Sequence, residues 1–453
     1  MSHSHYRTPH TTGSGTSNPG ADPRSGPDRP GRARRRPLPL TAGLAGALAL
    51  TLALSACGDS GSSPSDPDTG PTIQIQGVSE GAVLNEPVTI LITASPSGTS
   101  VTAELNGAPF RSGDTVGRAG SYTLEVEAFR GGRTTSETVR FSLEPTGERA
   151  MTFTLFDLGP QSAGGGGDAI LLADSSSLGF QYGLVDAGPF ADRPGLSIDD
   201  LDFRFVADQL LAMGVDTLEF VQLTHPHMDH VGGLTDVLRD IHVRYFVYNG
   251  QVRNFIRYQE AMVLAEQRAD SVFVPSEPWV FELGGPSGIR TTHIPGLPFY
   301  LGRHTNSGRE LNEGSLGTLV EFDGVRLFLT GDGEDEANLR WRSQFPELSG
   351  DLDILKVGHH GANNAIFDDR TGFTSTRSSW LEHTTPQVMV VSANGTTHPR
   401  IRANQRMTEV PNAELYCTNV HGTIRVRVVG GAWTVTTERN ADMDCVPGAD
   451  APT

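Results

Sequence analysis

Four side chains that commonly bind transition metals lie within six positions of the chain. The stretch LTHPHMDHVGG contains His225, His227, Asp229 and His230. Alternate side chains of an extended segment point to the same side, so His225 and His227 share a face, while Asp229 and His230 lie where the chain turns into a helix predicted to begin near Gly232. Imidazole combined with carboxylate suits zinc, manganese or iron. The spacing therefore predicts two short ligand clusters that face two neighbouring divalent ions, zinc or manganese.

Further candidate ligands follow predicted strands elsewhere in the chain. They are Asp186 in VDAGP, Asp332 in LTGDGE, and His359 and His360 in KVGHHGA. Buried Asp and His side chains are costly without polar partners, so several such strand endings are hard to explain by folding alone. A metal lowers the pKa of a bound water to about 7, and a metal pair can hold the attacking and leaving oxygens of a displacement. The pattern favours a metal-dependent hydrolase.

These residues lie in a region of mixed strands and helices that we predict to span residues 151–440. Stretches such as DAILLAD, TLEFVQLTH and VRYFVYNG are typical of strands, and they alternate with helical patterns such as SIDDLDFRFVADQLLAMG and NFIRYQEAMVLAEQRAD. GTLVEFDGVRLFLTGD is typical of a hairpin that turns at Asp323-Gly324. A layered domain of this kind gathers functional residues at the ends of its strands.

Six motifs in a fixed order resemble a known family. GDAILL, VDAGP, LTHPHMDHVGGL, NEGSLGTLVEFDGVRLFLTGDGE, DILKVGHHGA and SANGTTHPR follow one another between about residues 151 and 430. Together they resemble the metallo-β-lactamase fold superfamily, and KVGHHG with THP points to its ComEC-like branch of competence proteins. The resemblance implies an α+β fold, an αββα sandwich. It also implies that the substrate is a phosphodiester, either nucleic acid or a phosphorylated wall or lipid component.

The resemblance also implies a role for each motif residue. His225 and His227 would hold one metal ion, and Asp229 and His230 the second. Asp332 would bridge both ions, and His359 would complete the set, although His360 is the alternative ligand at that position. The residues expected to act in catalysis are Asp229, Lys356, His360 and His398. The residues expected to support the ligands or line the cleft are Asp168, Asp186, Asn312 and Ser315.

The chain departs from the broader superfamily at two places. A further histidine usually precedes the bridging aspartate, but this chain reads LNEGSLG there, with Asn312 and Ser315, as ComEC-like domains also tend to read. His293 and His304 are candidates to fill the gap, or else ordinary loop histidines. Extra residues in GPQSAGGGGDAILL precede Asp168, and they predict either a flexible insertion or a glycine-rich phosphate loop.

The first 70 residues are not predicted to form a domain. Residues 1–31 contain hardly any large apolar side chains and should be disordered. Residues 32–57 contain RARRRP, an apolar run and LSAC, the order of a bacterial lipoprotein signal in which Cys57 would be lipidated. A plain transmembrane anchor is the alternative, but the apolar run is shorter than the ~20 residues of a span. With a flexible tether at 58–70, we expect an exported, membrane-anchored protein that faces outside the cytoplasm.

Two further features concern the rest of the chain. Residues 71–147 alternate apolar and polar side chains in short stretches, which predicts a small Ig-like β-sandwich that serves as a spacer or adhesion module. Cys417 and Cys445 remain after Cys57, and in an exported chain a disulfide is expected rather than two free thiols. Residues 441–453 would form a C-terminal tail.

The charge of the chain restricts its partners. Removing residues 1–56 removes seven arginines and two aspartates, which changes the formal net charge from −18 to −23. So acidic a surface repels nucleic acid in general, and any polyanion must be held locally by metal or by a few cationic side chains. Lys356 is the only lysine, against 34 arginines, which suggests either that a compact ammonium is needed beside the metals or a coincidence. We expect a monomer that acts on short single strands or small phosphodiesters.

Two other functions are compatible with the same residues. A hydrolase of lactams, lactones or thioesters would share the metal ligands and differ in its pocket. A non-catalytic surface binding protein, with a degenerate site on an Ig-like stalk, belongs to another functional class. Intact candidate ligands in every motif argue against the second alternative.

Overall fold

The computed structural model describes residues 70–159, 166–189, 205–296, 307–369, 371, 374–440 and 442–448. The chain divides into two units, Met1–Ser62 and Ser63–Thr453. The predictions for the disordered segment, the signal peptide with Cys57 and most of the tether lie outside the described residues. Within the part that is described, no helix combines the length and the apolar character that crossing a membrane requires.

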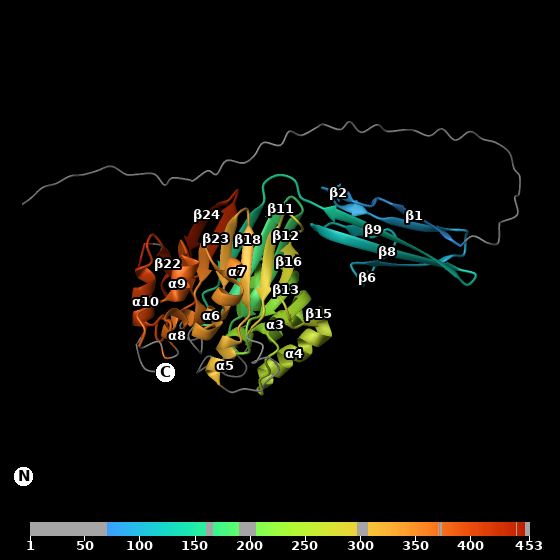
Figure 1. Cartoon of the computed structure of the whole chain (residues 1–453). Coiled ribbons are helices and arrows are strands. Elements are labelled where there is room, and N and C mark those ends of the chain that lie inside the picture. Colours follow the sequence, from blue (N-terminus) through green and yellow to red (C-terminus); the bar gives the residue numbers. More distant parts are fainter. Residues whose placement is uncertain are drawn as a thin grey trace, which may run out of the picture. The chain divides into compact units, whose positions relative to one another are not determined.

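Residues 72–143 form strands that make up three small sheets (Figure 1). The strands are β1 (Thr72–Gln76), β2 (Ala82–Leu84), β3 (Val88–Thr89), β4 (Leu91–Ser95), β5 (Ser100–Leu105), β6 (Ala108–Pro109), β7 (Thr115–Val116), β8 (Gly120–Arg130) and β9 (Arg133–Leu143). The largest sheet has the order β2-β9-β8-β5-β6. Ile90, Leu124 and Leu143 are fully buried in its core. The region is all β, and its assignment as Ig-like stays a prediction.

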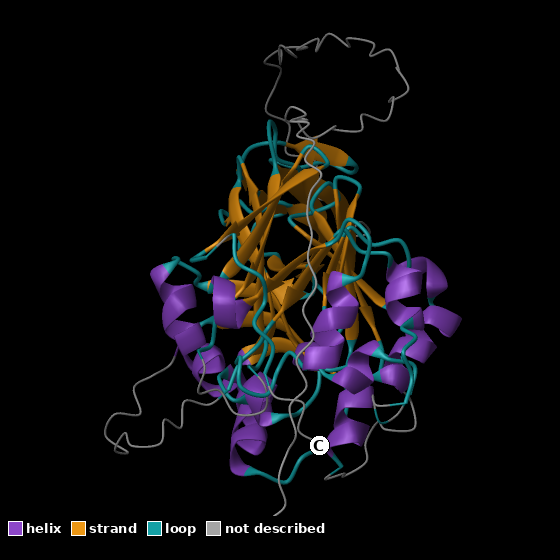
Figure 2. Ribbon diagram, turned by 90° about the vertical axis from the view of Figure 1, so that its left-hand side faces the viewer, coloured by secondary structure: helices purple, strands orange, loops and turns teal. Residues whose placement is uncertain are grey.

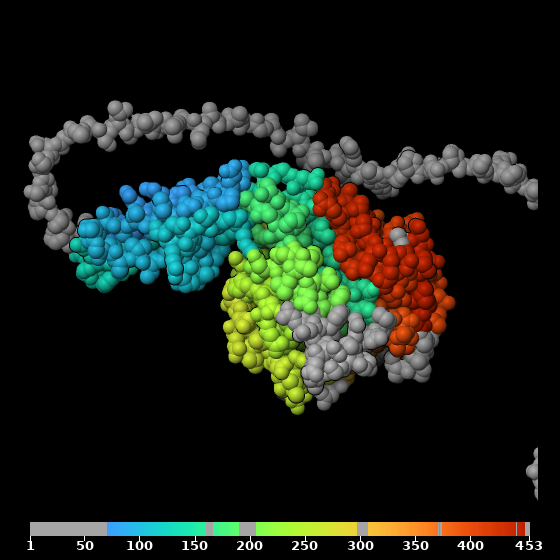
Figure 3. Space-filling view, turned by 180° about the vertical axis from the view of Figure 1, so that it is seen from behind, coloured from blue at the N-terminus to red at the C-terminus, as the bar shows by residue number. Residues whose placement is uncertain are grey.

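The first sheet of the following domain has eight strands. In their order across the sheet these are β15 (Ala269–Phe273), β14 (His242–Tyr248), β13 (Thr217–Leu223), β12 (Gly179–Ala187), β11 (Ala169–Ser176), β10 (Ala150–Leu155), β23 (Ile424–Val429) and β24 (Ala432–Thr437). The run from β12 to β15 is parallel. The pairing of β10 with β23 brings the two ends of this domain together, which Figure 3 shows as teal-green beside red.

The second sheet has seven strands. Across the sheet they are β16 (Trp279–Leu283), β17 (Ile289–Ile294), β18 (Gly317–Phe322), β19 (Val325–Leu329), β20 (Ile354–Lys356), β21 (Val388–Val391) and β22 (Glu414–Cys417). The run from β19 to β22 is parallel. The predicted hairpin is confirmed: β18 pairs with β19, and both turn residues, Asp323 and Gly324, have positive φ angles of 49° and 82°.

The two sheets pack face to face, and helices cover their outer faces (Figure 2). Phe153 of β10 and Val320 of β18 belong to one buried cluster, which lies between the sheets. The helices are α1 (Phe205–Ala212), α2 (Met228–Val231), α3 (Leu234–Asp240), α4 (Ile256–Arg268), α5 (Gly308–Glu313), α6 (Asp335–Gln344), α7 (Pro346–Ser349), η4 (Gly358–Gly361, a 3₁₀ helix), α8 (Asn363–Ile366), α9 (Ser379–Thr384), α10 (Ile401–Thr408) and α11 (Thr418–His421). The domain has the mixed α and β content that the sequence predicts.

One helix differs from its sequence pattern, and another is only partly described. The pattern that contains α1 began at Ser197, and its residues up to 204 lie outside the described residues. The pattern of the helix that differs extended to Asp270, but α4 ends at Arg268 and β15 begins at Ala269 without a loop. The β-sheet pairing of β15 with β14 captures these last residues, so tertiary contacts override the local helical pattern.

The carboxyl ends of parallel strands in both sheets carry the candidate site residues. Asp186 is at the end of β12, and the histidine motif follows β13 directly. Asp332 follows β19, and His360 follows β20 in η4. Parallel strands end at a common edge of their sheet, so residues far apart in the chain are brought to one place.

Candidate metal centre

The histidine motif turns sharply after β13. His227 has an extended backbone and is followed by α2, whose first turn is closed by the hydrogen bond from Gly232 N to Met228 O. The helix therefore begins at Met228, four residues before the predicted position near Gly232, because Val231 N and Gly232 N already donate hydrogen bonds to the carbonyl oxygens of His227 and Met228. Gly233 is required by packing, since a Cβ there would lie 2.2 Å from the carbonyl oxygen of Ala187.

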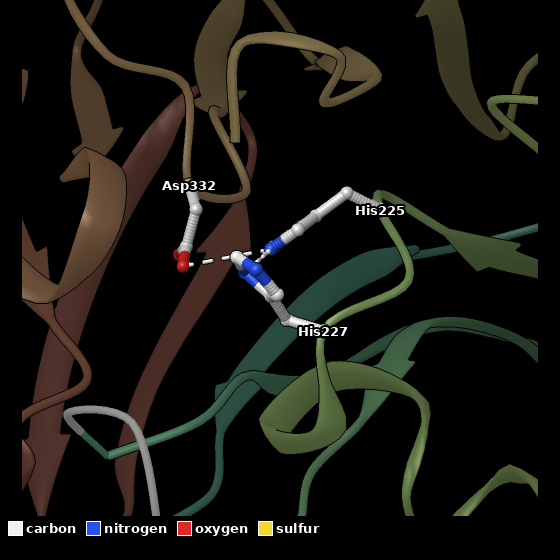
Figure 4. A group of neighbouring side chains, drawn as sticks. All are labelled: His225, His227 and Asp332. Atoms are coloured by element: carbon white, nitrogen blue, oxygen red, sulfur yellow. Dashed lines mark hydrogen bonds and ion pairs between the residues drawn. The ribbon is translucent and has the colours of Figure 1, made fainter. Parts of the chain in front are cut away.

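The first ligand group consists of His225, His227 and Asp332, whose side chains converge from the motif and from the loop after β19 (Figure 4). His225 Nε2 lies 2.9 Å from His227 Nδ1 and 3.6 Å from Asp332 Oδ2. His225 is fully buried and Asp332 nearly so. Three ligand atoms within 4.8 Å of one another form one face of a site for a single cation.

The second ligand group consists of Asp229, His230 and His360. His360 Nε2 lies 3.4 Å from Asp229 Oδ2. Asp332 also contacts this group, because its Oδ2 lies 3.3 Å from His230 Nε2 and its Oδ1 lies 3.4 Å from His360 Nε2. One carboxylate therefore reaches both ligand groups, which is the arrangement expected of a bridging ligand.

The chemistry of these side chains fits divalent cations. His230 Nε2, His360 Nε2 and Asp332 Oδ1 are buried, and among the described residues they have no hydrogen-bond partner. Buried polar atoms normally have a partner, so orphaned atoms that point to one place indicate an ion. The site also gathers buried carboxylates at Asp168, Asp186, Asp229 and Asp332. Buried charge of one sign is costly without compensation.

The electrostatics of the two groups differ. Burial, together with the neighbouring His230, lowers the pKa of His225 well below its ordinary value, and burial lowers the pKa of His227 to about 4. Burial opposes protonation of His360 as well, but Asp332 and Asp229 raise its pKa to about 9. The first group thus offers neutral imidazoles, the form that binds metal, and the second concentrates the negative charge that attracts a cation.

Asp186 orients one histidine of each group. Its backbone has a positive φ of 56°, and its carboxylate accepts hydrogen bonds from Thr224 N at 2.8 Å and Thr224 Oγ1 at 2.7 Å. The Thr224 hydroxyl lies 3.1 Å from His225 Nδ1, and Asp186 Oδ2 lies 2.7 Å from His230 Nδ1. With Nδ1 occupied on both rings, both Nε2 atoms are left for a metal.

Lys356 lies away from any surface that a substrate could reach. Its side chain is fully buried, and its ammonium contacts Asp168 and, at 3.2 Å, the carbonyl oxygen of Gly331. Asp168 also accepts a hydrogen bond from Ser392, whose hydroxyl lies 3.0 Å from His360 Nδ1. The geometry makes Lys356 a positioning residue that acts through Asp168 and Ser392, and it does not support the catalytic role that the sequence suggested.

The adjacent histidines of η4 have different partners. His360 joins the second ligand group, whereas His359 Nδ1 lies 3.0 Å from Glu334 Oε1, outside both groups. The geometry therefore favours His360 over His359 as the ligand. Asn312 donates a hydrogen bond to Glu334 at 2.7 Å, and Ser315 Oγ accepts one from Asp332 N at 3.2 Å.

Of the two histidines that were candidates to replace the missing ligand, the structure describes one, His293. His293 is buried in β17, bonded to Gln222 and Thr291 and packed edge-on against Phe220. It belongs to the core and to neither ligand group. His304 and the glycine-rich stretch before Gly166 lie outside the described residues.

His398 lies beside the centre on the loop after β21. Its ring centroid is 5.5 Å from that of His359 and 6.0 Å from that of His360, and its buried Nε2 has no hydrogen-bond partner among the described residues. The C-terminal tail packs against this loop, because Gly448 N donates to Pro399 O at 2.8 Å. A disulfide joins Cys417 to Cys445 in the same tail.

The disulfide leads to a testable prediction. Cys445→Ser should lower the free energy of unfolding by about 3 kcal/mol, because the bond closes a loop with a sequence separation of 28 residues. Thermal unfolding of the variant, compared with the parent with and without reductant, measures the effect. Labelling of the denatured, unreduced parent should find neither Cys417 nor Cys445 reactive, and two reactive thiols would contradict the prediction.

Several residues that contact the site histidines or their partners were not predicted from the sequence. The hydroxyls of Thr224 and Ser392 connect buried carboxylates to ligand histidines. Glu334 contacts His359, and Arg309 pairs with Glu334. Ser392 directly follows the strand β21, as other site residues follow theirs, so its position was a usable signal. Glu334 follows Asp332 by two residues, but its direction could not be known without the turn before α6.

Comparisons with known proteins agree with this geometry. A family model described as the metallo-beta-lactamase superfamily matches residues 182–303. ComE operon protein 3 of Bacillus subtilis (strain 168) is 26% identical over 223 residues, which is 48% of this chain and 26% of that protein. The matched region thus spans about a quarter of the length of the curated relative.

Two solved structures are also similar, at 13% identity each. A mutant of the CmlA beta-hydroxylase has a TM-score of 0.36, with 63% of this chain and 55% of that chain covered. A diphosphatase from the PhnP family has a TM-score of 0.33, with 62% of this chain and 98% of that chain covered. Scores of this size do not establish a shared activity. Residues 182–303 thus match the metallo-beta-lactamase superfamily, and the similarity to the relative in Bacillus subtilis supports a metallo-β-lactamase fold of the ComEC-like type.

Proposed function

We propose that this chain is a metal-dependent phosphodiesterase that acts on small phosphodiesters or short single-stranded nucleic acid. The observation that carries the proposal is the position of Asp332, whose two carboxylate oxygens reach both ligand groups. Two ions that share one carboxylate would be close neighbours, and such a pair can hold the attacking and leaving oxygens of an in-line displacement at phosphorus. We propose zinc or manganese as the ions, two in number.

The chain's own residues would prepare the site for this reaction. His225, His227 and Asp332 would hold one ion, and Asp229, His230 and His360, with Asp332, the other. When bound, such ions lower the pKa of a water and neutralise charge at the phosphoryl group. The protein keeps the ligands in place through hydrogen bonds from outside the cluster, which determine the tautomer of each imidazole.

The charge distribution favours a phosphodiester over a lactam or a lactone. The protein is acidic, with a formal net charge of −18, so a pair of ions would be a concentrated positive field within a negative surface. This field stabilises most a substrate whose own negative charge lies at the reacting centre. Long duplex nucleic acid would be repelled by the rest of the surface, so short substrates should be preferred.

A hydrolysis screen tests the proposal. The purified protein, loaded with manganese or with zinc, should cleave bis-(p-nitrophenyl) phosphate and a short single-stranded oligonucleotide, and should cleave duplex more slowly. His398→Ala should reduce turnover without releasing metal, because His398 lies beside His360 of the second group but belongs to neither group. An enzyme that leaves both phosphodiesters intact yet opens a lactone or a β-lactam would be a hydrolase of the other class. Absence of both activities and of bound metal would favour a non-catalytic binding protein.

We also propose that the mature chain is an exported lipoprotein anchored through Cys57. The support is the LSAC sequence after a basic and an apolar segment. In a bacterial host, the parent protein should stay in the membrane fraction after a high-salt wash, and Cys57→Ser should release it or leave the precursor unprocessed. Equal retention and equal processing of the two proteins would show that lipidation of Cys57 is not the anchor.

A further inference from the structure

We propose that His359 contacts the substrate beside the metal centre and that Glu334 is the residue that positions it. This inference rests on the proposed phosphodiesterase function. It assigns His359 a place different from the ligand position that the family resemblance implies. It also gives a role to Glu334, for which the sequence suggested none.

The backbone of η4 separates the two adjacent histidines. His359 and His360 have positive φ angles of 43° and 53°, and Gly361 follows at 78°. A left-handed conformation is unfavourable for a non-glycine residue and persists only where the surrounding structure holds it. Here it lets neighbouring side chains diverge: His360 enters the second ligand group, and His359 contacts Glu334. Strained backbone of this kind is common at functional sites.

Glu334 is a buried carboxylate whose partners fix it on His359. Its side chain is 2% exposed. Oε1 lies 3.0 Å from His359 Nδ1 and accepts a hydrogen bond from Asn312 Nδ2 at 2.7 Å, while Oε2 pairs with Arg309 at 3.1 Å. A buried carboxylate needs such partners, and a carboxylate held this way fixes both the tautomer and the orientation of the imidazole.

The helices that carry these partners are themselves tied together. Glu313 at the end of α5 accepts hydrogen bonds from the backbone N of Glu336 at 3.2 Å and of Ala337 at 2.6 Å, in the first turn of α6. Arg309 pairs with Glu313 at 2.7 Å and with Asp335 at 2.5 Å. The loop that carries Glu334 is therefore held rigidly, which is what positioning a second side chain requires.

His359 remains partly exposed although Glu334 contacts Nδ1 and Asn312 Nδ2 lies 3.3 Å from Nδ1 and 3.4 Å from Nε2. Its side chain is 19% exposed, whereas that of His360, the other histidine of η4, is fully buried. Its ring lies 5.5 Å from that of His398 and 6.0 Å from that of His360. The ring thus lies next to His360 of the second ligand group and is partly exposed, so a phosphodiester bound at the metal centre could contact it.

A matched pair of variants tests the role of Glu334. Glu334→Gln should lower kcat by about 10–100-fold, the usual effect of losing a partner that orients a site histidine, and should leave the bound metal unchanged. Glu382→Gln is the control, because Glu382 also pairs with an arginine, the exposed Arg377, and is not among the partners of Glu334 or His359. It should stay within about twofold of the parent. Thermal melting of both variants shows whether either one loses its fold.

Two substitutions at His359 separate contact with substrate from a structural role. The amide of glutamine lies near the place of Nε2, and that of asparagine near the place of Nδ1. His359→Gln should therefore recover part of the turnover that His359→Asn loses, with metal content unchanged in both. Equal losses in the two variants would mean that the ring is structural. Loss of metal in both would make His359 a ligand, as the resemblance implies.

The outcome also distinguishes this inference from the proposed function. If the parent cleaves phosphodiesters but Glu334→Gln behaves like Glu382→Gln, only the inference is wrong. If the metal-loaded parent cleaves neither bis-(p-nitrophenyl) phosphate nor the oligonucleotide, the proposed function is wrong and the inference with it. Selective loss in Glu334→Gln, with rescue by glutamine at His359, supports both.

Discussion

Asp332→Ala is expected to release both metal ions together and to lower turnover by about 10³-fold. The carboxylate of Asp332 reaches His225, His230 and His360, so its loss opens both ligand groups at once. A metal supplies several kcal/mol of charge stabilisation in the transition state, and each 1.36 kcal/mol corresponds to about tenfold in rate. The single substitution should therefore remove nearly all catalysis.

Elemental analysis of the purified variant, alongside its rate on bis-(p-nitrophenyl) phosphate, measures this effect. Asp270→Ala is a suitable control, because its carboxylate is 58% exposed and contacts only an exposed partner, His242. The control should keep the metal content and the rate of the parent. Retention of one ion per chain in Asp332→Ala would show that the ligand groups are independent and that Asp332 does not bridge them.

Lys356→Met is expected to destabilise the fold by about 3–5 kcal/mol. The ammonium is fully buried against Asp168, and removing it leaves a buried carboxylate without its cation. This loss corresponds to a decrease in Tm on the order of 10 °C for a domain of this size. Melting in the presence of EDTA separates the effect from any change in metal binding.

A double-mutant comparison identifies the cause of that loss. If Lys356 acts through Asp168, the variant Lys356→Met with Asp168→Asn should be less destabilised than the sum of the single variants. Arg427→Met, a loss of an arginine that is 49% exposed, should change stability by less than about 0.5 kcal/mol. An unchanged Tm in Lys356→Met would show that the buried pair contributes nothing, and that the single lysine is a coincidence.

Local sequence was enough to identify the ligand types and the class of the domain. Two histidines spaced by one residue, followed by an aspartate and a histidine at the start of a helix, place four ligands close together whatever the rest of the chain does. The Asp323-Gly324 hairpin was equally readable, because its positive φ angles favour those two residues. Such features depend on residues that are adjacent in the chain, so they can be predicted without knowledge of the fold.

The partner of each ligand depended on the tertiary structure. Asp168 and Ser392 are separated by 224 residues and Asp168 and Lys356 by 188, and only the meeting of strand ends from two sheets places them around His360. No periodicity in the sequence encodes which distant strands become neighbours. The burial of Lys356 against Asp168 could not be predicted for this reason, since its environment is determined by the other sheet.

The choice between His359 and His360 shows the same limit most clearly. The sequence by itself determined that a histidine after β20 belongs at the centre, because both candidates stand at the end of that strand. Which one enters the ligand group was decided by consecutive left-handed φ angles and by the capture of His359 by Glu334 and Asn312. A backbone conformation that is unfavourable for an isolated residue is held only by packing, so the folded structure alone determines which imidazole binds and which remains accessible.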